Sequence, residues 1–135
     1  MRLDEIKKKL IPCPYTNSII QVPLYHGTTG KFAKFNRVPH GVFFTPHMSH
    51  AEGTYGKDVI VCYVNIPKLY TLDYDNDGDD EIIDALFDRD YEAVAQAIIK
   101  LEKQGYYAMQ TQTDSEMICV FENTEICSAR TGKPM

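Results

Sequence analysis

The sequence predicts a single α+β domain, and three observations support this class. Residues 58–66 (DVIVCYVNI) are rich in β-branched and aromatic side chains, which is typical of a strand. Residues 81–104 carry apolar side chains at helical spacing. The 135 residues contain no linker, repeat or low-complexity tract, and this length fits one domain. We therefore expect one domain over residues 1–135, with an N-terminal helix and linker at 1–17 and a core at 18–130.

The first 30 residues combine a short helix with a strand. Residues 3–10 form an amphipathic pattern that is stopped by a pair of prolines. The apolar run 18–25 predicts a strand that leads into a turn at residues 26–30. Pro23 lacks a backbone donor, so it indicates an edge strand or a break in this run.

The middle of the chain predicts two more strands with a helix between them. Residues 41–45 (GVFFT) form a short apolar strand. Thr45 and Pro46 are a good N-cap and first residue for a brief helix that ends near residues 53–56. Pro67 then closes the long strand that precedes it.

The last half of the chain predicts the main helical segment and two further strands. Residues 73–81 read as an acidic loop, and the stretch 88–90 divides the helical pattern into two helices. Gly105 is a natural residue to follow the second helix. The expected strands are residues 106–109 and 117–121, joined by the polar loop 110–115.

The charge distribution and the cysteines exclude several classes of protein. The net charge is −5 with no long basic stripe, so non-specific nucleic-acid binding is not expected. No apolar run reaches the ~18 residues of a membrane span, and the charged N-terminus does not resemble a secretory leader, so we expect no membrane association and a cytoplasmic location. Four widely spaced cysteines predict free thiols, with Cys62 and Cys119 in the core, and no metal site.

An acidic segment offers one competing interpretation. Residues 73–78 begin like a calcium-binding loop, with aspartates at the first, third and fifth positions. The twelfth position is Asp84 where a bidentate glutamate is usual, and the eighth is Asp80 where an apolar residue is expected. A solvated acidic loop next to a helix N-terminus is therefore favoured over weak capture of a cation.

Three segments in sequence order stand out as motifs. The first ends a strand, the second is followed by a tyrosine at position 55, and the third combines a glycine-tyrosine pair with an acidic and apolar strand. The first motif is residues 24–28 (LYHGT) and the second is residues 41–45 (GVFFT). The third comprises residues 105–107 (GYY), 116–122 (EMICVFE) and 126–128 (ICS).

In this order and spacing the segments resemble the three signature motifs of ADP-ribosyltransferases of the histidine-tyrosine-glutamate class, which includes the poly(ADP-ribose) polymerases. The small modules at the ends of some phage head-morphogenesis proteins are similar. The resemblance covers roughly residues 22–130. It implies an ADP-ribosyltransferase-like fold, with two small facing mixed β-sheets, a cleft between them and two or three flanking helices.

The resemblance also implies a site for NAD as substrate. His26 would bind a ribose hydroxyl, and the backbone of Gly27 would bind the carboxamide, which requires close approach. Phe43 and Tyr55 would stack on the nicotinamide ring, although the apolar segment around Phe43 fits a core position equally well. Thr28 and Thr45 complete the expected dinucleotide-binding set.

The third motif decides whether the chain is an enzyme. Counting four residues back from Phe121 gives Met117, and the expected catalytic carboxylate, Glu116, lies one residue further away. Side chains alternate along a strand, so Glu116 faces the site only if a β-bulge corrects the direction. Gln112 and Asp114 fall in the expected target-directing loop, or are ordinary turn residues.

The sequence therefore predicts an NAD-dependent mono-ADP-ribosyltransferase that acts on a host or cellular macromolecule. A phage or bacterial effector fits a module of this size, with a protein acceptor favoured over nucleic acid. If phage-encoded, it would act in the host cytoplasm. The alternative is a protein of the same fold that lacks the catalytic carboxylate and serves as a binding or NAD-sensing module.

Overall fold

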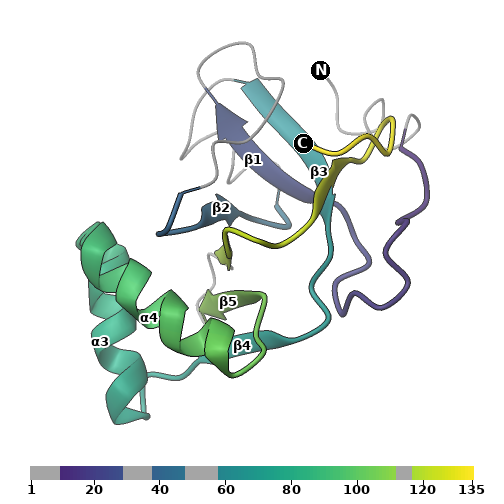
Figure 1. Ribbon diagram of the computed structural model, residues 1–135. Helices are drawn as coiled ribbons and strands as arrows, with labels where there is room; N and C mark the ends of the chain where they lie inside the picture. The colour runs from purple at the N-terminus through teal and green to yellow at the C-terminus, as the bar shows by residue number, and fades with distance from the viewer. Residues whose placement is uncertain (1–9, 29–37, 48–57, 112–116) are drawn as a thin grey trace.

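The computed structural model of the chain describes residues 10–28, 38–47, 58–111 and 117–135, which form an α+β arrangement of two small sheets and two helices (Figure 1). The elements in chain order are β1 (Leu24–Thr28), β2 (Val42–Phe44), β3 (Asp58–Val64), β4 (Leu69–Leu72), α3 (Asp77–Phe87), α4 (Tyr91–Lys103), β5 (Ala108–Thr111), β6 (Ile118–Val120) and β7 (Ile126–Ser128).

The strands form a three-stranded sheet in the order β1-β3-β7 and a four-stranded sheet in the order β2-β6-β5-β4. The pair β4 and β5 is parallel, and every other described pair is antiparallel. The two sheets are joined where Tyr25 and Thr45 exchange backbone hydrogen bonds of 2.8 and 3.0 Å. The α+β class and the two small sheets of the sequence prediction are confirmed, but only the four-stranded sheet is mixed, because both strand pairs of the three-stranded sheet are antiparallel.

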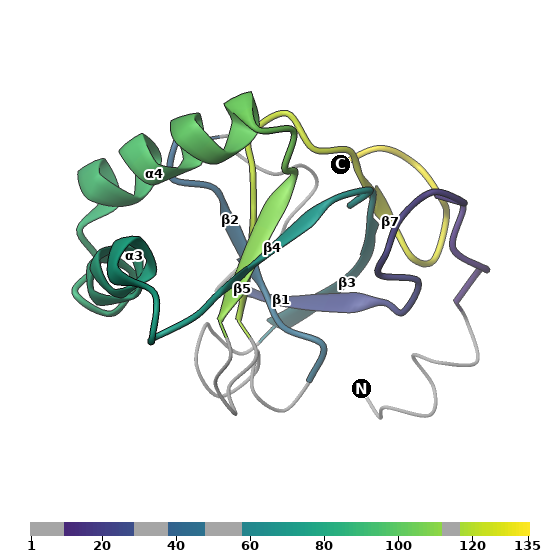
Figure 2. The same ribbon diagram turned by 90° about the horizontal axis from the view of Figure 1, so that it is seen from below.

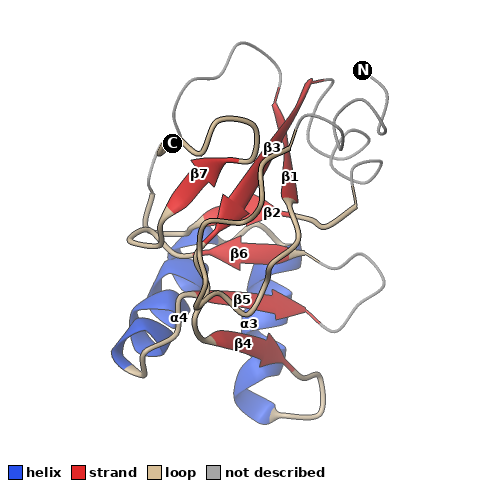
Figure 3. Cartoon of the chain, turned by 90° about the vertical axis from the view of Figure 1, so that its right-hand side faces the viewer, coloured by secondary structure: helices blue, strands red, loops and turns tan. Residues whose placement is uncertain are grey.

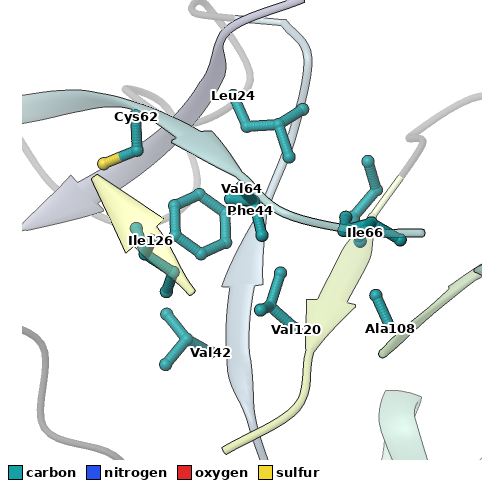
Figure 4. Packing of buried hydrophobic residues seen from close by; sticks show 10 residues of the cluster. Leu24, Val42, Phe44, Cys62, Val64, Ile66, Ala108, Val120 and Ile126 are labelled. Atoms are coloured by element: carbon teal, nitrogen blue, oxygen red, sulfur yellow. The ribbon is translucent and has the colours of Figure 1, made fainter. Parts of the chain in front are cut away.

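The space between the sheets is filled by one apolar core. Alternate residues of each strand point into it, because side chains along a strand alternate between the two faces. Phe44 lies near its centre, between the two sheets (Figure 4). The cluster contains Leu24, Val42, Phe44, Cys62, Val64, Ile66, Ala108, Ile118, Val120 and Ile126. Within the described ranges, the space between the sheets is therefore packed rather than open as a cleft.

The two helices cover the other face of the four-stranded sheet, so the molecule has helix, sheet and sheet layers (Figures 2 and 3). Buried side chains of α4 at Val94, Ile98 and Leu101 pack there with Met109 and Cys119 of the sheet. This spacing of three and four residues is the helical pattern seen in the sequence.

The break between the helices falls where the sequence predicts it. Arg89 adopts a positive φ of 56° between the two helices. Asp90 then caps α4, and its carboxylate accepts a hydrogen bond of 3.3 Å from the backbone N–H of Ala93. The chain turns here because the first helix ends at the αL residue and the second begins on a new cap.

The outer face of the three-stranded sheet is covered by the segment that precedes β1. Tyr63 of β3 donates a hydrogen bond of 2.6 Å to the backbone carbonyl of Ile11. Tyr25, Tyr63 and Cys127 form a small buried cluster, against which Ile11 and Tyr15 pack. Residues 10–16 therefore belong to the folded domain, although the helix expected at 3–10 lies outside the described residues except for its last position.

Several predicted boundaries are wrong. The first strand begins at Leu24, directly after Pro23, so His26 lies inside a strand and not in a turn. β1 is an edge strand of the three-stranded sheet, in agreement with the edge position that Pro23 indicates. Strand β4 has no counterpart in the sequence prediction, because its pattern LYTL is too short to be recognised without its partner β5.

The acidic segment is half helical. Helix α3 begins at Asp77, since carboxylates in a first turn are favoured by the helix dipole. The last eight positions of a calcium-binding loop would therefore lie in a helix, which does not fit the loop geometry of such a site. In the described ranges, no group of three or more His, Cys, Asp or Glu side chains is arranged to hold a metal ion.

Asp79 is the one buried carboxylate of this segment in the described part of the chain, with 4% of its surface exposed. It accepts hydrogen bonds from the Tyr70 hydroxyl at 2.7 Å and from the backbone N–H of Asp73 at 3.0 Å. The carboxylate therefore fixes the start of α3 against the end of β4. Neither helix, nor any other helical segment that the structure describes, is long and apolar enough to span a membrane.

Candidate functional site

The candidate site lies where β1 and β2 diverge from one another. Backbone hydrogen bonds join the two chain segments at Tyr25 and Thr45. If the antiparallel pairing of Tyr25 with Thr45 continued for two residues, Gly27 would lie opposite Phe43. Strand β2 leaves β1 at this point and pairs with β6 instead. The sheets therefore separate beside the first sequence motif.

The His26 side chain bridges this divergence. Its Nδ1 lies 2.7 Å from the carbonyl oxygen of Phe43. In a continuous antiparallel pair of strands, this oxygen would accept a hydrogen bond from the backbone N–H of Gly27. A carbonyl oxygen only accepts, so Nδ1 is the donor and carries the proton. In the neutral ring, Nε2 is then the nitrogen with the lone pair. An imidazole in this state can accept a hydrogen bond from a hydroxyl group.

The surroundings of His26 favour that neutral state. The residue is half-buried and lies on the same face of β1 as Leu24, at the margin of the core between the sheets. Its ring lies 5.5 Å from the ring of Phe44, at an interplanar angle of 51°. Burial lowers the pKa of His26 below its usual 6.5, and the hydrogen bond to the Phe43 carbonyl offsets part of this effect.

The backbone of Gly27 faces the same divergence. Backbone groups of a strand point alternately to its two edges, so those of Gly27 point to the edge that Tyr25 uses for Thr45. Among the described residues, β2 forms no hydrogen bond with Gly27 at this edge. The motif thus places the histidine ring and the backbone of the buried Gly27 at neighbouring positions of β1.

Phe43 and Phe44 have different surroundings, because adjacent strand residues face opposite sides. The side chain of Phe43 packs against the cluster under the helices, and that of Phe44 contacts His26. The structure therefore supports the core interpretation of Phe43, whose backbone carbonyl is the group that orients the histidine. Sequence reasoning missed Phe44 as the neighbouring ring, although its spacing of two residues from the core residue Val42 was a usable signal.

Gly41, the first residue of the second motif, is required by close packing. Its φ is +83°, and a Cβ there would lie 2.6 Å from Cys119 Sγ and 2.8 Å from the carbonyl oxygen of Val120. The glycine thus allows β2 to lie directly against β6. Its role is structural and it positions the carbonyl of Phe43.

The third motif joins the other two through β6. Phe44 pairs with Ile118, the first residue of that strand, so the order β1, β2, β6 brings all three sequence motifs together. The predicted catalytic Glu116 precedes Ile118 by two positions in the sequence. Residues 112–116 and 48–57 lie outside the described part of the chain, and with them Tyr55, Gln112, Asp114 and Glu116.

The two threonines of the predicted set have backbone roles. Thr45 is fully buried, and its hydroxyl accepts a hydrogen bond of 3.2 Å from the backbone N–H of His47, as an N-cap residue does. Thr28 ends β1 and pairs with Asp58 of β3. The helix that the sequence predicts after Thr45 falls mainly on residues 48–57, which lie outside the described part of the chain.

Two surface cavities lie on other elements. One, of about 200 Å³, is lined by residues that include Glu102, Tyr106 and Tyr107, and the other, of about 330 Å³, by residues that include Tyr15 and Glu125. Pockets for small molecules span roughly 300–1,000 Å³. The smaller cavity is below this range and the larger is at its lower limit.

Comparisons with known proteins identify a structural relative. No protein-family model matches the chain, and no curated protein sequence matches it. A solved structure described as the crystal structure of an anti-CRISPR protein superposes with a TM-score of 0.52 and 12% sequence identity, covering 78% of this chain and 93% of that chain. At this identity the likeness shows the fold alone.

Proposed function

We propose that the chain is an NAD-dependent mono-ADP-ribosyltransferase with its nicotinamide site at the divergence of β1 and β2. The observation that carries the proposal is the hydrogen bond of 2.7 Å from His26 Nδ1 to the Phe43 carbonyl, beside the backbone of Gly27. In this proposal Nε2 accepts a hydrogen bond from a sugar hydroxyl, and the backbone of Gly27 binds a primary amide. The nicotinamide riboside portion of NAD has this combination of groups.

The reaction requires the site to hold nicotinamide still while its bond to C1′ of the ribose breaks. Nicotinamide leaves with the electron pair of that bond, and positive charge develops on the sugar. A nucleophilic oxygen or nitrogen of the acceptor forms the new bond to C1′, and its proton is transferred to a base or to solvent. His26 binds a ribose hydroxyl through Nε2, and Gly27 binds the carboxamide.

Glu116 is the residue we propose for charge stabilisation. It precedes β6, which pairs with β2 directly beside the histidine strand. A carboxylate there would stabilise the positively charged sugar and orient the acceptor, an effect typically worth ~10²–10³ in rate for one electrostatic group. Tyr55 as a stacking residue and Gln112 and Asp114 as target-loop residues belong to the same proposal.

We further propose that the acceptor is a protein of a CRISPR defence system. The structural relative is described as an anti-CRISPR protein, and it shares the fold over 93% of its length. A phage-encoded transferase acting in the host cytoplasm would meet such an acceptor, and the excess of acidic residues makes direct action on nucleic acid the weaker alternative.

The test measures nicotinamide release and NAD binding on the same samples. We expect the wild-type chain to bind NAD and release nicotinamide, and Glu116→Gln to retain binding while its rate falls at least 100-fold. His26→Ala should lose both. His40→Ala is the matched control, because His40 stacks on Tyr91 instead, with ring centroids 4.2 Å apart.

The outcomes separate the enzyme from its alternative. Binding of NAD without nicotinamide release, unchanged by Glu116→Gln, would establish the binding or NAD-sensing module. Neither binding nor release by the wild-type chain would overturn the dinucleotide site itself. Incubation with labelled NAD and purified CRISPR effector complexes then identifies the acceptor. If NAD is cleaved but none of these complexes is labelled, the proposal of a CRISPR acceptor is rejected and the proposed NAD cleavage stands.

A further inference from the structure

The exposed side of α3 has an unusual composition for a surface helix. Its exposed residues, which we call the α3 face, are Asp80, Glu81, Asp84, Phe87 and Asp88. Phe87 is 65% exposed in the last turn, although its ring is fully apolar. The buried side of the same helix packs normally through Ile83 and Ala85. The exposed aromatic is therefore not a consequence of poor packing of the helix.

Two carboxylates of the α3 face, those of Asp84 and Asp88, are placed where they destabilise the helix. Asp84 and Asp88 lie in the last turn and at the C-cap, next to the negative end of the helix dipole, and no basic residue lies in that turn. Asp80, Asp84 and Asp88 are spaced by four, so like charges also repel along one side. These three carboxylates form no ion pair with any described residue. A basic partner would relieve this repulsion.

The negative charge of the chain is concentrated in the segment that contains α3. Residues 73–92 contain ten acidic residues and one basic residue, a net charge of −9, whereas the remaining residues contain nine acidic and 13 basic, a net charge of +4. Such an asymmetric field attracts an oppositely charged surface and orients its approach. The overall charge of −5 conceals this asymmetry.

A second exposed aromatic residue follows the α3 face in the sequence. Tyr91, the first residue of α4, is 42% exposed, and its ring stacks on His40. Phe87 and Tyr91 are separated by the turn that contains Arg89. Aromatic side chains with carboxylates around them have the composition of an interface centre with a charged rim.

We propose that the α3 face is a docking surface for a second protein that presents lysine and arginine side chains around an apolar pocket for Phe87. Charge complementarity selects this class of partner, because a carboxylate rim repels nucleic acid and anionic membranes. Phe87 supplies the apolar anchor that distinguishes docking from diffuse electrostatic attraction. The inference does not depend on the proposed transferase activity, since α3 lies on the far side of the four-stranded sheet from His26.

The test uses a defined probe and the full chain. The probe is a helical peptide of about 20 residues with arginines around a row of leucines, and the same peptide with arginine replaced by glutamine is its control. Binding to isotope-labelled chain is followed by NMR. We expect shifts confined to residues 80–91, and none with the glutamine peptide.

Three variants separate docking from net charge. We expect at least tenfold weaker binding for Asp84→Lys/Asp88→Lys and at least fivefold weaker binding for Phe87→Ala, which does not alter charge. Glu102→Lys/Glu125→Lys changes the net charge by the same amount on other elements and should bind within twofold of wild type. Each variant must melt cooperatively, and the lysine pair on α3 should melt at a higher temperature than wild type.

Several results would overturn the proposal. Phe87→Ala with wild-type affinity would leave only diffuse attraction, and equal losses in both charge-reversal variants would show an effect of net charge. A wild-type dimer in sedimentation that Asp84→Lys/Asp88→Lys dissociates would make the occupant a second copy of this chain. Stabilisation of the wild type by millimolar calcium, lost in that variant, would make it a cation site.

Discussion

His26 Nδ1 lies 2.7 Å from the carbonyl oxygen of Phe43, at the point where the register of β1 and β2 would set Gly27 opposite Phe43. A side chain thus takes the acceptor that a continuous sheet would give to the backbone. The hydrogen bond fixes the ring and its tautomer, and the separation of the strands leaves the backbone of Gly27 facing the site. The following predictions test this arrangement and the packing that supports it.

The stability of the fold should depend on the protonation of His26. Its pKa is lowered by burial, so the unfolded chain binds the proton more readily than the folded chain. The stabilisation from the neutral ring is therefore complete above pH 6.5 and is lost as the pH falls from 6.5 through the lower folded pKa. Urea unfolding at pH 7.5 and 5.0 should show a smaller decrease for His26→Gln than for wild type, and equal decreases would contradict the assignment.

Gly41→Ala should be strongly destabilising. The new Cβ would meet Cys119 Sγ at 2.6 Å and the Val120 carbonyl at 2.8 Å, at a φ of +83°. Strain in the left-handed region and overpacking each cost about 1–3 kcal/mol, so we expect a loss of about 3 kcal/mol in the free energy of unfolding. Urea denaturation measures it.

Gly78→Ala is the matched control for that variant. Gly78 lies in α3 with no atom within 4 Å of a Cβ built there. Alanine in a helix is more favourable than glycine by about 0.5–1 kcal/mol, so this variant should be more stable than wild type. If both glycine variants changed stability by the same amount, close packing at Gly41 would not be the cause.

Tyr70 should lose its proton at an unusually high pH because of its contact with Asp79. The hydrogen bond to the Asp79 carboxylate is the main reason that the pKa of Tyr70 is raised to about 12. The stabilisation is therefore complete below pH 10 and is lost as the pH rises from 10 to 12. Ultraviolet titration should assign a phenol near 12 that is absent in Tyr70→Phe and shifts toward 10 in Asp79→Asn, where an unchanged titration would exclude the contact.

Reversal of charge on α3 should stabilise the isolated chain. Asp84→Lys and Asp88→Lys each place a cation at the negative end of the helix dipole, worth about 0.3–1 kcal/mol per site. Low-salt urea denaturation should show the gain, and 1 M salt should reduce it by screening. A destabilised double variant would contradict the account of the α3 face as a surface with unrelieved repulsion.

The sequence by itself determined the α+β class, the division of the helical segment near residues 88–90 and the core position of Cys62 and Cys119, both fully buried. These features follow from local patterns, because helical spacing and β-branched composition are read within a short window. It also identified Phe43 as compatible with the core, and His26 with Gly27 as the first motif, although it placed the histidine in a turn.

The tertiary structure alone decided which strands pair and where they part. The parallel pairing of β4 with β5, the bridge between Tyr25 and Thr45 and the contact of His26 with Phe44 join residues far apart in sequence. Such contacts depend on the register of neighbouring strands, where a slip of one residue moves every side chain to the other face. No local pattern in the sequence fixes that register, and the site at His26 exists only because two sheets diverge beside it.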